Sequence, residues 1–338
     1  MSIRNALLSL CACALIVGSS QHAQAQEKVT FASSSTSMLN LPVYVADVLG
    51  YFAEQKIEPE IVVFKNGGAT ALAAVLGGNA DVYIGAPSSA LGAANKGADA
   101  MIFGAIMTEV ALDLIAQKDV AAKAGLTARS SVAARFRALK GLKIGVTGAG
   151  SATHQIAQYA LKISGLDPER DATIVFVNSN EDMQAAYMSK RVDALVTANP
   201  TSVAMVKDGS YLLADGAAGD YPTLGGMASL VLVGTNKWLS ARPDRATRLL
   251  SAIKSAEVAI HDPEVSKKAR DLVQAKYFAQ LDKEIFAGAW EAVIPAIPIG
   301  PRLADDTIQR NVEFLKEFSN QRYTIAPEKV FTNAYQPK

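Results

Sequence analysis

Short runs of apolar and β-branched residues alternate with alanine- and leucine-rich segments in the first part of the chain. The runs Lys28 to Ser33, Ile61 to Phe64 and Val82 to Ile84 have the length and composition of strands. Helical segments follow them, such as Pro42 to Leu49, which has proline near its start and Gly50 just past its end. This alternation of strand and helix predicts an α/β fold with a mostly parallel sheet.

The same order of elements returns about 113 residues later in the chain. Leu142 to Val146 matches the first strand, Ile174 to Val177 the second and Asp193 to Val196 the third. The polar turn Ala198 to Ser202 then corresponds to Ala86 to Ser89. Because chance rarely repeats so many successive elements, the sequence predicts two similar α/β units in tandem.

After residue 227 the pattern changes to one strand, Ala228 to Val233, followed by mainly helical chain. Four segments there have apolar residues at helical spacing: Arg245 to Ile260, Val265 to Phe278, Lys283 to Val293 and Asp305 to Phe318. One strand cannot form a third sheet, so we expect this tail to cover the first unit. The prediction is a two-lobed protein with helices flanking both sheets and a two-strand hinge. Lobe 1 comprises residues 26–115 and 228–338, and lobe 2 comprises residues 116–227.

The N-terminus has the features of an export signal over residues 1–25. Arg4 precedes an apolar run that is shorter than the roughly 20 residues needed to span a bilayer, and a small-residue motif ends at Ala25. We expect cleavage after Ala25 and a periplasmic location. Both cysteines, Cys11 and Cys13, lie in this leader, so the mature chain has no disulfide. Lipidation of Cys13 is the alternative.

Composition and motifs exclude several classes of protein. Half of the 338 residues are hydrophobic, which excludes a disordered chain, and a net charge of +1 argues against a nucleic-acid partner. Outside the leader the histidines are His154 and His261, too few for a transition-metal site without cysteine. The usual hydrolase and nucleotide-phosphate motifs are absent, and the turn at residues 148–153 lacks the third glycine of a dinucleotide site. We therefore expect no metal, no cofactor and no catalytic residue.

Four polar loops follow predicted strands and open helices: Ser33 to Asn40, Asn66 to Thr70, Pro87 to Ser89 and Gly148 to His154. Ligands of open α/β sheets bind beyond the carboxyl ends of parallel strands, where helix N-termini offer N–H groups to an anion. The alternative is that each Ser or Thr only caps its helix. The acidic loop Asn178 to Asp182 does not suit a pure anion, so either it points away or the ligand also carries a donor or cationic pole.

The motifs that identify a family lie in both units. They are Leu41 to Ala46, Gly50 to Phe52, Gly78 to Val82, Leu139 to Val146, Gly150 to His154 and Val192 to Val196. In these motifs the chain resembles the periplasmic solute-binding proteins of ABC importers, of the nitrate, sulfonate and taurine type that also includes binders of thiamine precursors. The resemblance covers about residues 28–235.

The resemblance implies a protein that captures a small organic anion, such as a sulfonate or carboxylate, between two lobes that close by hinge bending. The implied ligand contacts come from the four polar loops and from the turn Ala198 to Ser202. They are Ser33, Ser34, Asn40, Gly68, Thr70, Ser88, Ser89, Ser151, Thr153, His154, Asn199 and Thr201. The implied partner is an ABC permease in the inner membrane, and the protein is expected to be a monomer and not an enzyme.

Three alternatives stay open. One is binding or processing of a thiamine precursor such as a pyrimidine, although the mature chain lacks the cysteines found in some of those proteins. Another is a ligand-sensing subunit of a receptor. The third concerns residues 118–143, which carry seven basic side chains and one acidic one: they form either a solvated surface or a docking patch for a membrane partner.

Overall fold

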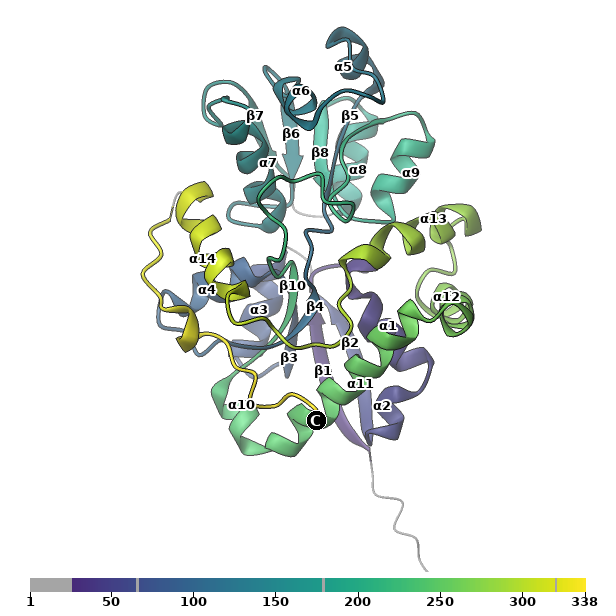
Figure 1. Ribbon diagram of the computed structural model, residues 1–338, viewed down its shortest axis with the longest axis vertical. Coiled ribbons are helices and arrows are strands. Elements are labelled where there is room, and N and C mark those ends of the chain that lie inside the picture. Colours follow the sequence, from purple (N-terminus) through teal and green to yellow (C-terminus); the bar gives the residue numbers. More distant parts are fainter. Residues whose placement is uncertain (1–25, 65–66, 178–179, 320) are drawn as a thin grey trace, which may run out of the picture.

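The computed structural model describes residues 26–64, 67–177, 180–319 and 321–338. The predicted signal peptide, with Cys11 and Cys13, lies outside these residues. The described chain forms two lobes, each built on one five-stranded sheet with helices on its faces (Figure 1). Among the described residues, no helix is long and apolar enough to cross a membrane.

The first sheet has the strand order β2-β1-β3-β10-β4. Its strands are β1 (Glu27–Ser33), β2 (Ile57–Val63), β3 (Val82–Gly85), β4 (Met101–Met107) and β10 (Leu230–Gly234). β1 pairs in parallel with β2 and β3, whereas β10 is antiparallel to both of its neighbours. Four strands therefore point the same way and one is reversed, so the sheet is mixed.

The second sheet repeats this arrangement in the order β7-β6-β8-β5-β9. Its strands are β5 (Asp113–Ala116), β6 (Lys143–Val146), β7 (Thr173–Phe176), β8 (Ala194–Thr197) and β9 (Tyr211–Ala214). β6 is parallel to β7 and β8, and β5 is the reversed strand in the fourth position. The matching orders confirm the internal repeat. β5 places the start of the second sheet at Asp113, inside the range predicted for lobe 1.

The chain passes between the sheets twice, from β4 to β5 and from β9 to β10. The connecting residues, 108–112 and 215–229, belong to neither sheet. Each connection therefore joins a strand of one sheet to a strand of the other through residues that are not in β-structure. The two connections touch at Gly216. A Cβ atom there would lie 2.1 Å from the Val110 carbonyl oxygen and 2.3 Å from that of Leu112.

Helices follow the strands as predicted. Those of the two repeated units are α1 (Leu41–Val48), α2 (Tyr51–Glu54), α3 (Gly68–Leu76), α4 (Pro87–Ala94), α5 (Lys118–Lys123), α6 (Val132–Arg137), α7 (Ala152–Ile163), α8 (Asn180–Met188) and α9 (Thr201–Lys207). The tail contains α10 (Asn236–Ala241), α11 (Pro243–His261), α12 (Pro263–Tyr277), α13 (Lys283–Val293) and α14 (Thr307–Phe318).

The tail covers the first lobe but does not stop there. α11 and α12 pack against α1, as expected from their apolar faces. α13 contacts α9, and α14 packs against both α4 and α7, so these two helices also reach the second lobe (Figure 1). The tail therefore covers the first unit as expected, and two of its helices contact the second lobe in addition. The apolar face of α14 has two partners, one from each lobe.

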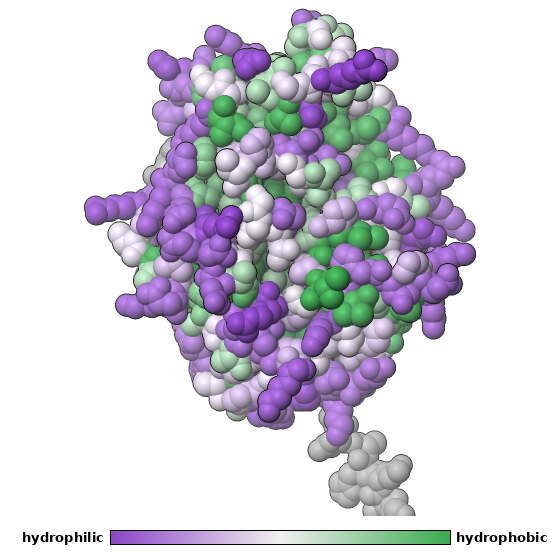
Figure 2. Space-filling model, viewed as in Figure 1, coloured by the Kyte–Doolittle hydropathy of each residue, from purple (hydrophilic) through white to green (hydrophobic). Residues whose placement is uncertain are grey.

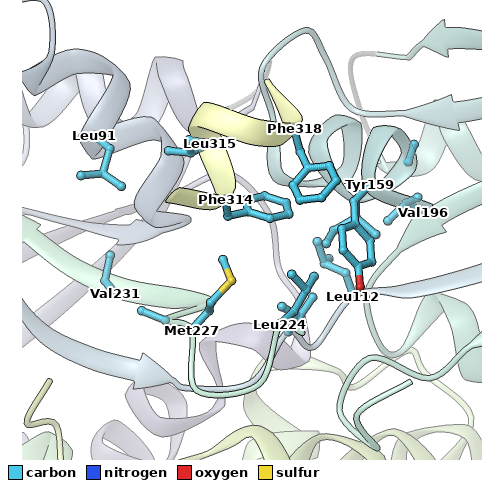
Figure 3. Close-up of a cluster of buried hydrophobic side chains, with 14 of the residues drawn as sticks. Leu91, Leu112, Tyr159, Val196, Leu224, Met227, Val231, Phe314, Leu315 and Phe318 are labelled. Carbon is cyan, nitrogen blue, oxygen red and sulfur yellow. The ribbon is translucent and has the colours of Figure 1, made fainter. Parts of the chain in front are cut away.

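A buried apolar cluster continues from one lobe to the other beneath α14. Leu91 from the first lobe, Tyr159 from the second and Phe314 and Phe318 from α14 belong to the same cluster, with Leu224 from the second connection (Figure 3). The rings of Tyr159 and Phe318 are 5.0 Å apart, at an angle that favours edge-to-face contact. This packing fixes α14 at the junction of the lobes.

Candidate functional site

The loop after β1 is held together by the side chain of Asn40. Its Nδ2 lies 3.0 Å from Ser33 Oγ, 2.9 Å from the Ser35 carbonyl oxygen and 3.1 Å from the Tyr44 hydroxyl. Asn40 is buried, so its amide shapes this loop and is not free for a ligand. Ser34 is half-buried in the same loop.

The next two predicted loops meet at Tyr83. A Cβ atom on Gly68 would lie 2.5 Å from the Tyr83 hydroxyl oxygen and 3.2 Å from Ser89 Oγ, so only glycine fits where α3 begins. Burial raises the pKa of Tyr83 to about 12, which keeps the hydroxyl protonated. The first turns of α3 and α4 are therefore adjacent. Thr70 is exposed on α3.

The loop from Gly148 to His154 forms a compact hydrogen-bonded start to α7. Ser151 caps the helix, because its Oγ accepts from the His154 N–H at 3.2 Å and donates to the Gly148 carbonyl at 2.8 Å. Thr153 Oγ1 accepts from the Thr147 N–H at 2.9 Å. The capping role considered for Ser151 is confirmed, and Thr153 orders the turn.

His154 presents a neutral donor at this loop. Its Nδ1 accepts from the Gly150 N–H at 3.0 Å, which leaves the proton on Nε2. Burial lowers the pKa of His154, and the ring stands edge-on to Phe176 at 5.2 Å. Since Ser151 Oγ is bonded to Gly148 and not to this imidazole, the loop lacks the geometry of a nucleophile and its base.

The turn after β8 links the lobes through Asn199. Its carbonyl accepts from the Met38 N–H at 3.0 Å, which joins the first loop of one lobe to the second lobe. Its side-chain Oδ1 lies 2.9 Å from Ser202 Oγ, which is itself 2.5 Å from Asp113 Oδ2. The backbone carbonyl and the side-chain oxygen of Asn199 are therefore both used in hydrogen bonds within the protein. Thr201 is half-buried at the start of α9.

Asp113 is a buried carboxyl at the point where the first connection enters the second sheet. Burial raises its pKa to about 6, against the hydrogen bonds from Ser202 and the Gly216 N–H, and the nearby Asp215 and Asp220 raise it further. Between pH 4 and pH 6 the folded state therefore holds a proton that the unfolded state has lost. The stability that this proton contributes declines as the pH rises through that window.

Asparagine at position 113 should remove this pH dependence. Between pH 4.5 and 7.0 we expect wild type to lose about 2 kcal/mol of unfolding free energy relative to Asp113→Asn, as integration of the shift requires. Urea unfolding at both pH values measures the difference. Asp305→Asn, at a side chain that is 94% exposed, is the control and should follow wild type. Parallel profiles for wild type and Asp113→Asn would contradict the prediction.

A cavity of about 40 Å³ lies between the lobes. Its wall combines the start of α4, the first turns of α7, both connections and α14; the residues include Ser88, Leu112, Gln155, Met227, Asn311 and Phe314. Of the predicted ligand residues, only Ser88 lines it. Gln155, Met227 and the residues of α14 were not predicted, and the one sequence signal was Asn311, a polar residue on the apolar face of its helix.

Comparison with known proteins places the chain in a family. The family model described as NMT1/THI5 like matches residues 39–266, which is more than half of the chain. The chain belongs to the NMT1/THI5-like family. No curated protein sequence matches the chain. Membership confirms the resemblance inferred from the motifs of both units.

Solved structures share the fold of this family member. A protein from Bordetella bronchiseptica RB50 is 24% identical with a TM-score of 0.75, over 92% of this chain and 96% of that one. The alkanesulfonate-binding protein of Xanthomonas axonopodis pv. citri, bound to MOPS, is 19% identical with a TM-score of 0.67, over 91% and 99%. The periplasmic nitrate-binding protein of Synechocystis PCC 6803 is 14% identical with a TM-score of 0.67, over 92% and 87%. These likenesses confirm the two-lobed periplasmic-binding-protein fold.

Within the described residues, no group of three or more His, Cys, Asp and Glu side chains could hold a metal ion. Of the five predicted binding segments, only that of His154 contains a titratable side chain. The site as described therefore offers hydroxyls, amides and helix N-termini to a ligand, and no charged side chain.

Proposed function

We propose that this family member is a periplasmic substrate-binding protein that captures a small organic anion between its lobes and delivers it to an ABC permease in the inner membrane. One observation supports this most directly. The cavity between the lobes is lined by the first turns of two helices, α4 from one lobe and α7 from the other. Helix N-termini favour anions because of their unpaired N–H groups and their dipole.

The positions of the predicted residues agree with this proposal. Gly68, Thr70, Ser88 and Ser89 stand on adjacent helix starts of the first lobe, and Ser151 and His154 on the facing start of the second. Ligand binding would shift the protein toward a closed state in proportion to how much more tightly the closed state binds the ligand than the open state does. The alkanesulfonate and nitrate binders with this fold support the class of ligand. We propose that the protein binds its ligand without turnover and acts as a monomer.

A pyrimidine is the second candidate ligand, because of one exposed aromatic side chain. Phe176 ends β7, is 50% exposed and lies beside His154. An exposed ring next to a neutral N–H donor suits the face and edge of a heteroaromatic ring. Pyrimidines therefore belong in the same screen as the anions.

Ligand binding should appear as thermal stabilisation of the mature chain. We expect at least one of ethanesulfonate, propionate, nitrate, taurine and a pyrimidine to raise the melting temperature, since a ligand at 100 times its dissociation constant adds about 2.7 kcal/mol. Calorimetry and X-ray scattering on the same hit measure affinity and compaction. A flat response to the whole set, or saturated binding without compaction, would contradict the proposal.

A bulky residue in place of Thr70 tests whether the ligand binds at the start of α3. Thr70 is exposed at the start of α3, so Thr70→Trp should leave the fold intact and weaken a hit at least tenfold by steric exclusion. Lys254→Trp, on the exposed face of α11, is the control and should bind like wild type. If both variants bind equally well, the ligand does not occupy this site.

A further inference from the structure

The cavity between the lobes has an almost entirely apolar wall. Phe314 and Leu315 of α14 line it together with Met227 and Leu224 of the second connection, and Figure 3 labels these four side chains within one buried cluster. One water needs roughly 10–15 Å³ of such space, so about 40 Å³ holds three or four non-hydrogen atoms. The wall contains no charged side chain. It therefore suits a short neutral group.

Two residues of this wall carry a buried oxygen without a hydrogen-bond partner among the described residues: Ser88 Oγ and Asn311 Oδ1. The residues are only 9% and 6% exposed. Such a group costs about 1–3 kcal/mol when it stays unsatisfied. Both unsatisfied oxygens belong to residues that line the same cavity. This coincidence points to a ligand that enters the cavity and supplies the missing hydrogen bonds.

The role of each Asn311 atom follows from its neighbour. Nδ2 donates to the Ala228 carbonyl at 2.9 Å, and since a carbonyl only accepts, the amide cannot be turned round. Oδ1 is left as an acceptor that needs an O–H or N–H. The serine hydroxyl of Ser88 can rotate to either role.

We infer that Asn311 is a specificity-determining residue of the proposed binding site: the cavity takes the short uncharged end of an organic anion, and Asn311 Oδ1 accepts a hydrogen bond from a hydroxyl or neutral N–H on it. This inference rests on the proposed function, because the anionic end would lie at the starts of α4 and α7, which border the cavity. An ammonium is disfavoured, since no carboxylate lines the wall to pair with it. The ligand class is thus a short hydroxylated organic anion.

Matched sulfonates test the hydrogen bond. Wild type should bind 2-hydroxyethanesulfonate at least fivefold more tightly than ethanesulfonate or taurine by calorimetry, the range expected when a buried acceptor gains its donor. Asn311→Leu removes the acceptor at similar size and should bring the hydroxyl preference to about one. Ala152→Leu fills the cavity from α7 without touching a polar contact, and should also abolish the preference. A preference unchanged in both variants overturns the inference.

A neutral probe separates this inference from anion capture. In protein with ¹³C-labelled methionine methyl groups, 2-propanol should shift the Met227 signal saturably, and Asn311→Leu should weaken this at least fivefold. Acetone, of similar size but without a donor, should respond equally in both proteins. No Met227 shift, or an equal 2-propanol response in Asn311→Leu, overturns the inference. If the alcohol behaves as expected but no anion binds, the proposed function fails while the assignment of the cavity stands.

Discussion

Alanine in place of Gly216 is expected to destabilise the protein by about 3 kcal/mol or more. The added Cβ would lie 2.1 Å from the Val110 oxygen, 2.3 Å from the Leu112 oxygen and 2.9 Å from the Leu112 nitrogen. All three are backbone atoms of the other connection between the lobes, so no side-chain rotation relieves the overlap. The two connections must separate, and the bond from the Gly216 N–H to Asp113 Oδ1 is strained or lost.

Urea unfolding of Gly216→Ala and wild type measures this loss. Gly92→Ala is the control: it lies in α4, where the new Cβ would meet only the Tyr323 hydroxyl at an ordinary 3.6 Å. Because alanine favours helix, this variant should gain about 0.5–1 kcal/mol. If Gly216→Ala were as stable as wild type, the close contact between the connections would not exist in solution.

Asn40→Ala should cost about 2–4 kcal/mol and weaken any ligand at least tenfold. Its Nδ2 lies within hydrogen-bond distance of Ser33 Oγ, the Ser35 carbonyl and the Tyr44 hydroxyl, so alanine removes this shared donor and leaves the Ser35 carbonyl with the Ser33 hydroxyl alone. The loop it holds also carries the Met38 N–H that bonds the second lobe through the Asn199 carbonyl. Both folding and lobe closure therefore depend on this amide.

Two further variants separate the donor from the volume of the side chain. Asn40→Asp keeps the shape but sets an oxygen against the Ser35 carbonyl, which only accepts, and should therefore also be destabilising. Ser35→Ala removes a hydroxyl while leaving the bonded carbonyl in place, and should change stability by less than about 0.5 kcal/mol. Thermal unfolding and calorimetry give both quantities. A stable Asn40→Asp would show that the amide is not the loop's anchor.

The repeated strands and the tail helices could be predicted because each is a local pattern. Lys283 to Val293 matches α13 at both ends, and the first strand differs from β1 by one residue. β2 begins at Ile57, earlier than predicted, because Glu58, Pro59 and Glu60 interrupt the apolar run. That polar stretch is tolerated since β2 is an edge strand with only one paired side.

The strands that were missed lie where the order of the chain departs from simple alternation. β4 follows a helix and leads straight to β5 in the other sheet, with no helix between them. β5 and β9 have four residues each and stand outside the strand–helix alternation by which the equally short β3, β6, β7 and β8 were recognised. That α14 contacts both lobes could not be predicted either, because an apolar face does not specify what covers it.

The predicted site residues divide according to what their side chains already bond. Asn40, Ser151 and Thr153 are used by their own loops, so a polar residue after a strand predicted the right place but not a free side chain. Ser88 lines the cavity. Asn311 was missed because it lies far along the chain from every strand end, in a helix whose amphipathic pattern predicts only packing.

The reversed strand of the first sheet has a consequence for biosynthesis. β10 separates β3 from β4, yet it begins at Leu230, after the whole second sheet has been made. As the polypeptide leaves the ribosome, the edges of β3 and β4 therefore stay open until the second lobe is complete, and exposed edges invite aggregation. An N-terminal fragment ending before residue 230 would lack the strand that joins β3 to β4 in its own sheet.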